Sequence, residues 1–424
     1  MRKLFSNPAW VTIAAFGTYF CMYGFRKPYT AATYGGAAFF HLDYKVLLVI
    51  AQTLGYVMAK WIGIKVVSEI RPRGRIGMLI GLIALAEVML LLFGIVPRPW
   101  NILCLLLNGL SLGIVFGLVL GFLEGRRHTE ALVAGLCTSF ILSDGVSKSV
   151  GKLLLDHGVS EDWMPFYAGG LFLIPTLLFI AMLSCVPAPS ADDVTQRSVR
   201  VPMHAGARRA FFMKYATGLA GIVTAYLFVT LLRSIRADFA PEIWKALGYR
   251  QDPTLFTTSE LLVSLGVLLI SALAIFILNH YQAFRFSLLT SLGGFLLLPL
   301  SVWALAHGLD RFTFMVLIGF GVYLPYVAVH TTLFERLIAL TRERANISFL
   351  MYIADSVGYT GYILLMLFRY MASPGDSILL LLLRGCVFMG VVGGAIILYC
   401  NWYFRRKLGG VPMRVAEIAP AAVS

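Results

Sequence analysis

The sequence is poor in charged residues, which make up 13% of its 424 positions, against about 25% in a typical soluble domain. Acidic residues are the scarcer kind, with 21 against 35 lysines and arginines, whereas hydrophobic residues reach 59%. The hydrophobic residues are gathered in long runs. Such a composition excludes a soluble globular protein and is typical of a polytopic membrane protein.

Cysteine and the common catalytic motifs are equally sparse. The six cysteines lie singly within apolar runs and include no Cys-x-x-Cys pair, which argues against a zinc site or a disulfide framework. No P-loop, His-Glu-x-x-His or Gly-x-Gly-x-x-Gly after a strand occurs, and no Ser/His/Asp set or pair of carboxylates shares one face. The seven histidines are interpreted as surface or interface residues. We therefore expect no metal, no cofactor and no enzymatic activity.

Twelve apolar runs predict an all-α membrane protein with twelve transmembrane helices. They are expected at residues 9–34, 43–68, 76–96, 100–123, 130–155, 164–186, 212–239, 255–279, 285–306, 310–336, 346–370 and 378–403. The first run is too long and too interrupted for a removable signal peptide. A basic segment at 188–211 is expected to link two six-helix bundles, 1–187 and 212–407, and a tail follows at 408–424.

The net charge of +14 resides largely in alternate loops. The basic loops contain Arg71, Arg73, Arg75, Arg126, Arg127, Arg197, Arg200, Arg208, Arg209, Arg342, Arg344, Arg405, Arg406 and Lys407. The other loops contain Asp156, Glu161, Asp162, Glu242, Asp252 and Asp310. Because basic loops remain in the cytoplasm, we expect both termini there, in a bacterial inner membrane. The positive charge therefore does not indicate nucleic-acid binding.

The two halves share a pattern of charges. Asp144 follows Glu124 by 20 residues, and Asp355 follows Glu335 by the same interval. In each case an acid ends one helix, a basic loop follows, and an aspartate lies midway along the next helix. The agreement of position, loop charge and spacing indicates an internal duplication and two pseudo-symmetric bundles, as in many transporter folds.

Charged residues inside the apolar runs are the most informative feature of the chain. The cations are Arg26, Lys27, Lys60, Lys148, Arg233 and Arg236, and the anions are Asp144, Asp238, Glu260 and Asp355. An isolated charge at this depth costs about 2.5–3.5 kcal/mol on insertion scales. The surplus of two cations, with Arg26 and Arg233 in corresponding helices of the two halves, favours an anionic substrate.

Helical spacing places hydroxyl groups beside both arginines. Tyr19, Tyr23, Arg26 and Thr30 are expected on one helical face, and Tyr226, Thr230 and Arg233 on another. A guanidinium binds two oxygens of a phosphate at once, so these faces suit a tetrahedral oxyanion.

The remaining interior charges are expected to pair. Helices one and seven should face each other. We expect Lys27 to pair with Asp238 in one state of the carrier, and Lys60 to pair with Glu260 in the same state or in the other. Two roles are open for Asp144 and Asp355. Each either forms a structural pair, Asp144 with a cation such as Lys148, or carries a proton with the substrate.

Five of the expected helices contain short motifs that occur in the same order in a known carrier family. They are Tyr23, Arg26, Lys27, Tyr29 and Ala32 in helix one; Lys60 in helix two; Arg233, Asp238, Phe239 and Pro241 in helix seven; Glu260 in helix eight; and Gly319, Phe320, Tyr323 and Pro325 in helix ten. Glu69 follows Lys60 at the position where that family usually has an aspartate. In these motifs the chain resembles the organophosphate:phosphate antiporters of the major facilitator superfamily.

The resemblance implies that Arg26 and Arg233 hold a phosphate between the two halves, with Lys60 and Tyr323 lining the site. It implies a monomeric secondary transporter of a small phosphorylated or other organic anion by alternating access, with inorganic phosphate as the exchanged ion. The chain departs from the family in having Asp144 and Lys148, and no histidine, in helix five. Two alternatives follow: a proton-coupled anion symporter, and a transporter-like membrane sensor of a phosphorylated metabolite.

Overall fold

The computed structural model describes residues 7–35, 38–39, 42–69, 72–123, 129–187, 213–250, 252–277, 279–341, 347–372 and 377–408. Within these ranges the chain is helical apart from turns, connecting loops and one short antiparallel hairpin, in which β1 (Ala38–Phe39) pairs with β2 (Leu42–Asp43). The expected linker at 188–211 lies outside the described residues, and so does the expected tail beyond Leu408.

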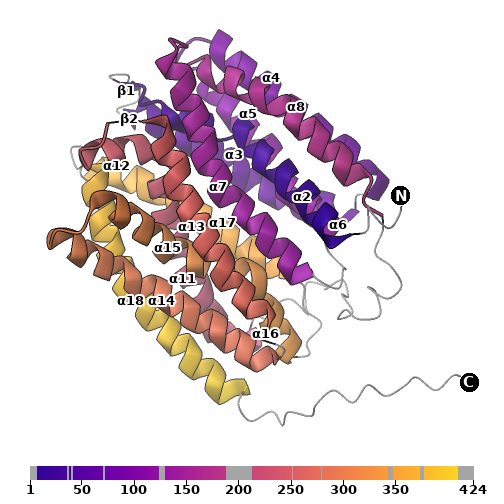
Figure 1. Cartoon of the computed structure of the whole chain (residues 1–424), viewed down its shortest axis with the longest axis vertical. Helices are drawn as coiled ribbons and strands as arrows, with labels where there is room; N and C mark the ends of the chain where they lie inside the picture. Colours follow the sequence, from indigo (N-terminus) through magenta and orange to yellow (C-terminus); the bar gives the residue numbers. More distant parts are fainter. Residues whose placement is uncertain are drawn as a thin grey trace, which may run out of the picture.

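The first half of the chain forms one bundle, drawn from indigo to magenta in Figure 1. Its helical elements are α2 (Pro8–Met22), the short turns η1 (Tyr23–Phe25) and η2 (Pro28–Ala31), α3 (Tyr44–Glu69), α4 (Pro72–Ile95), α5 (Ile102–Leu112), α6 (Val115–Leu123), α7 (Thr129–Asp156) and α8 (Met164–Ser184). The fourth expected span is divided at Gly113 into α5 and α6, which together cross the bundle.

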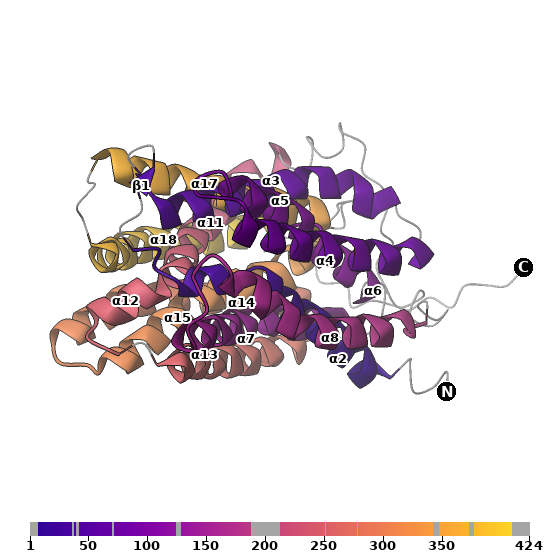
Figure 2. The ribbon, with the colours of Figure 1, turned by 90° about the horizontal axis from the view of Figure 1, so that it is seen from above.

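The second half forms the other bundle, drawn from pink to yellow. Its elements are α11 (Ala216–Asp238), α12 (Ala240–Ala246), α13 (Pro253–Ile275), α14 (His280–Ala306), α15 (Arg311–Ala328), the π-turn η3 (Val329–Leu333), α16 (Phe334–Thr341), α17 (Ile347–Ala372) and α18 (Ile378–Leu408). The bundles meet where α3 lies beside α17 and α7 lies beside α13 (Figure 2). The expected architecture of two six-helix bundles is confirmed.

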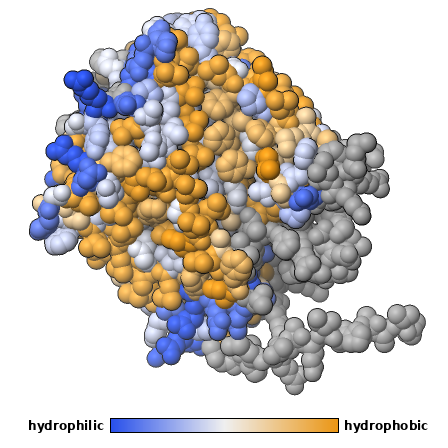
Figure 3. Space-filling view, viewed as in Figure 1, coloured by the Kyte–Doolittle hydropathy of each residue, from blue (hydrophilic) through white to orange (hydrophobic). Residues whose placement is uncertain are grey.

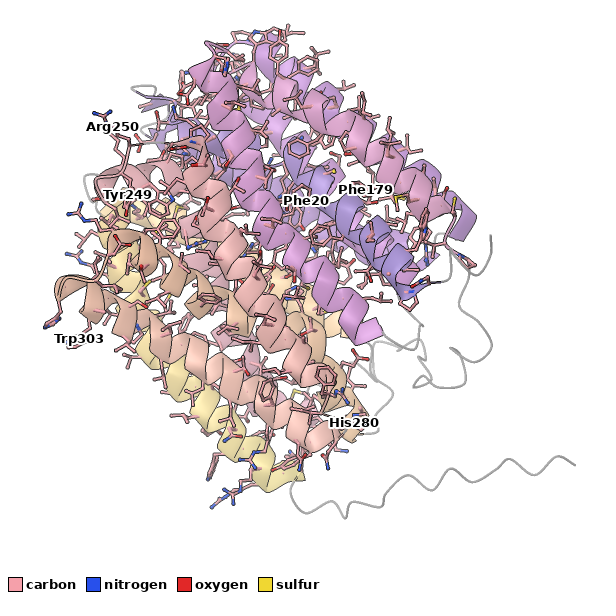
Figure 4. All side chains as sticks on the ribbon, viewed as in Figure 1. Phe20, Phe179, Tyr249, Arg250, His280 and Trp303 are labelled. Atoms are coloured by element: carbon pink, nitrogen blue, oxygen red, sulfur yellow. The ribbon has the colours of Figure 1, made fainter. Side chains whose placement is uncertain are left out.

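Two ends of the molecule are named here for reference. The terminal end is where α2 begins and α18 finishes, and the hairpin end carries β1, β2 and α12 (Figure 1). Figure 4 labels Tyr249, Arg250 and Trp303 at the hairpin end and His280 at the terminal end. Of the basic residues expected in the cytoplasm, Arg405, Arg406 and Lys407 lie in the last turn of α18, at the terminal end. Most of the others, Arg126 and Arg342 among them, lie outside the described ranges.

The surface fits a lipid environment. Ten of the described helical segments are long and apolar enough to cross a membrane; α2, which ends after 15 residues, and α7, which contains Asp144 and Lys148, are not among them. Hydrophobic residues fill the middle of the face shown in Figure 3, and hydrophilic residues gather toward its ends. The protein is therefore an integral membrane protein.

Burial separates inner helices from outer ones. The most apolar 18-residue window is 67% buried in α3 and in α11, but only 33% buried in α4, α8, α13, α14 and α18. Of these five, α13 differs from the others because it carries the buried Glu260 and packs along α7 of the other bundle. The other four are therefore the outer helices.

The first span is broken at its arginine, contrary to the expected helix 9–34. The α-helix ends at Met22, and η1 and η2 replace it on either side of Arg26 and Lys27. Pro28 contributes to the break, since proline lacks the N–H that would continue the hydrogen bonds of the helix. The helical face expected for Tyr19, Tyr23, Arg26 and Thr30 therefore does not exist as predicted.

The break leaves backbone carbonyls without helical partners, and buried amides satisfy them. Gln52 Nε2 donates to the Arg26 carbonyl at 2.9 Å, and Asn108 Nδ2 donates to the Phe25 carbonyl at 3.1 Å. Gln52 also donates to Asn108 at 2.9 Å, so the two amides form one network. An unsatisfied carbonyl at membrane depth would cost several kcal/mol. The network thus holds Arg26 in a fixed, non-helical position.

Glycines allow α3 and α5 to approach closely enough for this network to form. A Cβ at Gly109 would overlap the Gln52 carbonyl, and one at Gly55 would overlap the Leu106 carbonyl. At Gly113 a Cβ would lie 2.9 Å from the Tyr56 carbonyl oxygen. Gly109 and Gly113, four residues apart in the fourth span, therefore form part of a packing surface, as small residues at this spacing do in membrane helices.

Replacing Gly109 by alanine is expected to lower the unfolding temperature of the detergent-solubilised protein. The added methyl group meets backbone rather than a movable side chain, and such overpacking costs about 1–3 kcal/mol. Gly81→Ala in α4 is the matched control, because a Cβ there has no other atom within 4 Å. Equal unfolding temperatures for the two variants would contradict the close packing of α3 on α5.

Candidate functional site

Arg26 and Arg233 lie on opposite sides of the interface between the bundles, each against the face of a tyrosine. The Arg26 Cζ is 3.9 Å from the ring centre of Tyr56, and the Arg233 Cζ is 4.5 Å from that of Tyr326. Arg233 Nη2 also donates to the Tyr359 hydroxyl at 3.1 Å. The Tyr56 and Tyr359 rings meet edge to face at 5.2 Å, so a tyrosine pair bridges the two arginine sites.

Neither arginine has a carboxylate partner among the described residues. Both are buried, with exposed fractions of 6% for Arg26 and 7% for Arg233. The Nε of each has no hydrogen-bond partner. A guanidinium cannot be deprotonated in a protein, and burying an unpaired charge is unfavourable. The arrangement therefore leaves two positive charges that an external anion can neutralise.

The other four cations counted in the apolar runs, together with Lys45, each have a carboxylate partner. The pairs are Lys27–Asp238, Lys45–Glu242 at 2.6 Å, Lys60–Asp355 at 2.9 Å, Lys148–Asp144 and Arg236–Glu260 at 2.6 Å. Acidic residues are therefore present near the interface, but they pair with these five cations and not with the two arginines. Carboxylates lie beside every cation of this interface that has been named here except Arg26 and Arg233.

The expected pair of Lys27 and Asp238 is confirmed, and Asp238 also accepts from the Tyr362 hydroxyl at 3.0 Å. This contact joins the first half of the chain to α11 in the second. Lys45 of α3 makes a parallel connection to Glu242 of α12 and donates to the Thr30 carbonyl at 2.9 Å. Both contacts lie toward the hairpin end, where they hold the bundles together.

The expected pair of Lys60 and Glu260 does not form in this conformation. Lys60 pairs with Asp355 of α17, and Glu260 pairs with Arg236 of α11. The physical reason is helix adjacency: α3 packs on α17, whereas α13, which carries Glu260, packs on α7 and α15 beside α11. Arg236 reaches Glu260 and also donates to the Met315 carbonyl at 3.2 Å.

Asp144 and Asp355 occupy different environments despite their matching positions in the sequence. Asp144 pairs with Lys148 one turn later on α7, the structural partner expected for it. Asp355 receives Lys60 from the other bundle and the Tyr226 hydroxyl from α11. Glu124, from which the spacing to Asp144 was counted, lies outside the described residues, so the two halves of the repeat cannot be compared at that position.

The three tyrosines expected at the site lie at different distances from the arginines. The Arg26 Cζ is 5.5 Å from the centre of the Tyr23 ring. Tyr323 is buried with its ring 6.4 Å from that of Tyr326. The Tyr226 ring stacks on the Tyr326 ring at 5.2 Å, and its hydroxyl donates to Asp355. Tyr226 therefore positions Tyr326, the tyrosine that contacts Arg233.

Sequence reasoning missed the aromatic platforms and one histidine. Tyr56, Tyr326 and Tyr359 contact the arginines directly, yet each looks in the sequence like an ordinary tyrosine of an apolar helix. His330 was expected at a surface or interface, but it is buried 3.6 Å from Asp355. Its place in the middle of a long apolar run was the available signal.

The comparisons with known proteins agree with this architecture. A family model described as a family of unknown function (DUF5690) matches residues 28–407. A search of curated proteins found no match. Among solved structures, the crystal structure of a D-xylose–proton symporter is similar, with a TM-score of 0.60, 14% identity, and coverage of 96% of this chain and 98% of that one. At this identity the similarity shows the fold alone, which is the major facilitator fold. The resemblance to organophosphate antiporters stays a prediction.

Proposed function

The chain belongs to the family of unknown function DUF5690, and we propose that it is a secondary active transporter of a small organic anion, most simply a phosphorylated metabolite. Its fold is that of major facilitator transporters. In such folds the substrate binds near the middle of the membrane between two bundles, which open to either side in turn.

An anionic substrate is supported by the two arginines that have no carboxylate partner among the described residues. Arg26 belongs to the first bundle and Arg233 to the second, and both are buried without a carboxylate partner in the described part of the chain. An anion placed between them would interact with both bundles at once. It would therefore stabilise the state in which the bundles are close together, as alternating access requires.

Phosphate chemistry fits the neighbouring groups best. A guanidinium presents parallel N–H donors that match two phosphate oxygens. The Tyr359 hydroxyl, which already contacts Arg233, and the nearby Tyr23 hydroxyl can supply further hydrogen bonds. A carboxylate or sulfate offers similar oxygens, so the organic part of the substrate must decide specificity.

We also propose that the terminal end faces the cytoplasm of a bacterial inner membrane and that the protein acts as a monomer. Arg405, Arg406 and Lys407, which end α18 at the terminal end, support this orientation. In that orientation the contacts Lys27–Asp238 and Lys45–Glu242 close the side of the protein away from the cytoplasm.

A thermal-shift panel is expected to identify the anion class. Inorganic phosphate, glycerol 3-phosphate, glucose 6-phosphate and sulfate are each added to the purified protein, with glycerol and glucose as uncharged controls. Ligand at 100 times its Kd stabilises the folded state by about 2.7 kcal/mol, so a bound phosphate ester should raise the unfolding temperature by several degrees. A shift with glucose but none with any phosphate would contradict an anion site.

Uptake by proteoliposomes then separates a transporter from a sensor. A transporter exchanges the radiolabelled anion that gives the largest thermal shift across the liposome membrane. Binding without any exchange would instead favour a transporter-like sensor of the same metabolite, since the binding residues would be the same in both.

A further inference from the structure

A second buried polar cluster lies beside the Arg233 site and surrounds His330. This histidine is part of η3, a single π-turn between α15 and α16. Single π-turns inside α-helices occur frequently at functional sites. The His330 ring stacks on Tyr326 with a centre-to-centre distance of 4.6 Å. The anion site and the histidine therefore share Tyr326.

The hydrogen bonds of His330 define where a proton can bind. Its Nδ1 lies 3.0 Å from the Tyr326 carbonyl oxygen, which can only accept, so Nδ1 carries a hydrogen. In the neutral ring, Nε2 then presents a lone pair. Nε2 points to Asp355 Oδ1 at 3.6 Å and to the Tyr226 hydroxyl at 3.5 Å. A proton added to Nε2 would face a carboxylate directly.

Titratable and charged groups approach this cluster from every neighbouring element. They are Tyr226 and Arg233 of α11, Tyr326 of α15, Asp355 of α17, Lys60 of α3 and Cys137 of α7. The charged residues Glu335 and Arg336 lie on α16, which follows η3, and Arg336 contacts His280. From α6 the Phe116 ring contacts the histidine, and from α14 Ser287 reaches the adjacent Thr332. Asp355 is thus the carboxylate that faces His330 Nε2.

We propose that Nε2 of His330 is a proton-binding site, and that the carrier moves its anion together with a proton. The proposal rests on the anion-carrier function proposed above. The proton comes from the aqueous side to which the site is open, converts the neutral imidazole to imidazolium, and leaves from the same nitrogen on the other side. Histidine suits this role because its charge changes between pH 5 and 8.

Proton and anion favour each other's binding through Tyr326. Arg233 and His330 both lie against this tyrosine, so a protonated His330 adds positive charge next to the anion site. By linkage, an anion held at Arg233 must in turn favour protonation. The two ligands therefore bind and leave together, which is the requirement for movement in the same direction.

The proton also acts on a contact between the bundles. Asp355 of α17 pairs with Lys60 of α3 at 2.9 Å. An imidazolium on Nε2 supplies Asp355 with a second cation from its own half of the chain. The carboxylate then depends less on Lys60, and the connection between α3 and α17 weakens. Proton binding is thereby linked to separation of the bundles near the terminal end.

The test uses radiolabelled inorganic phosphate and proteoliposomes containing wild-type protein or His330→Gln. Glutamine keeps a polar side chain but does not titrate. Both proteins are expected to exchange phosphate at equal pH on the two sides. Only the wild type should accumulate phosphate when the outside is made acidic, and nigericin, which collapses the pH gradient, should abolish that accumulation. The ionisation of phosphate also changes with pH, but it is the same in both experiments and cannot explain a difference between the two proteins. His307→Gln, at an exposed histidine near the hairpin end, is the control and should accumulate normally.

His330→Lys is the second variant, and it applies even if the glutamine variant fails to exchange. The phosphate Kd of each protein is measured at pH 6 and at pH 8. Because the lysine keeps its charge, the ratio of the two Kd values should be about tenfold smaller for His330→Lys than for the wild type. Wild-type accumulation in His330→Gln, or an unchanged pH dependence in His330→Lys, would overturn the proton site alone. Absence of phosphate exchange by the wild type would overturn the anion carrier, and with it the proton site.

Discussion

Replacing Arg26 or Arg233 by lysine is expected to weaken binding of the anion by roughly 10- to 100-fold. Lysine keeps the charge but loses the planar set of donors that binds two oxygens. A hydrogen bond to a charged group contributes about 1.5–3 kcal/mol, and 1.4 kcal/mol corresponds to a tenfold change in Kd. Neither arginine has an acidic partner among the described residues, so folding should be little affected. Titration calorimetry with inorganic phosphate or a phosphate ester measures the loss.

Arg236→Lys is the matched control for this prediction. Arg236 lies three residues after Arg233 on the same helix and is equally buried, but it pairs with Glu260 and the Met315 carbonyl. Its replacement should lower the unfolding temperature and leave phosphate affinity nearly unchanged. Wild-type affinity in both Arg26→Lys and Arg233→Lys would contradict the proposed site, and so would an equal loss in all three variants.

Asp238→Asn is expected to destabilise the protein by about 3–5 kcal/mol, because the substitution leaves Lys27 buried without a counter-ion. Lys27 and Asp238 are both almost fully buried, and Tyr362 completes the contact. Asparagine preserves the shape of the side chain, so the effect should come from the lost charge. The unfolding temperature in detergent measures it.

The double variant Lys27→Met/Asp238→Asn should recover much of that stability, since it removes the lone ammonium group. Asp156→Asn is the control. It breaks the exposed pair between Asp156 and Lys152, and such surface pairs contribute only about 0–1 kcal/mol. An equal effect of Asp238→Asn and Asp156→Asn would show that the buried pair does not hold the bundles together.

Much of the architecture follows directly from the sequence. Long apolar runs predict the spans, and most observed helices agree with them within a few residues; the run expected at 43–68, for example, forms α3 at Tyr44–Glu69. The surplus of two interior cations agrees with two arginines that lack acidic partners. The numbers of cations and anions in the apolar runs can be counted from the sequence without knowing which helices are in contact.

Partners and local breaks could not be predicted in the same way. The sequence indicates that Lys60 faces the interior of the protein. Its partner is Asp355 and not Glu260 because α3 packs on α17, and this packing cannot be predicted from the sequence. Pro28 is the local signal for a break in the first helix, because proline cannot donate a helical hydrogen bond. The amides that make the break tolerable, Gln52 and Asn108, come from other helices and carry no local signal.

His330 shows a different limit of the sequence. A histidine in an apolar run is compatible with a simple core residue, and nothing nearby in the sequence links it to Asp355 or Tyr226. The π-turn that holds it depends on tertiary packing, because a single extra residue per turn has no clear pattern in the sequence. Only the tertiary structure shows that Asp355 and Tyr226 both face Nε2, the geometry on which the proposed proton site rests.

The most direct measurement of the central claim is a structure of the protein with arsenate, a phosphate analogue whose arsenic atom scatters anomalously. We predict one anomalous peak between Arg26 and Arg233, with arsenate oxygens within hydrogen-bonding distance of both guanidinium groups. The same peak should be absent from Arg233→Lys crystals soaked at the same concentration. A peak bound by only one of the two arginines, or arsenate found only at other basic residues, would contradict the account.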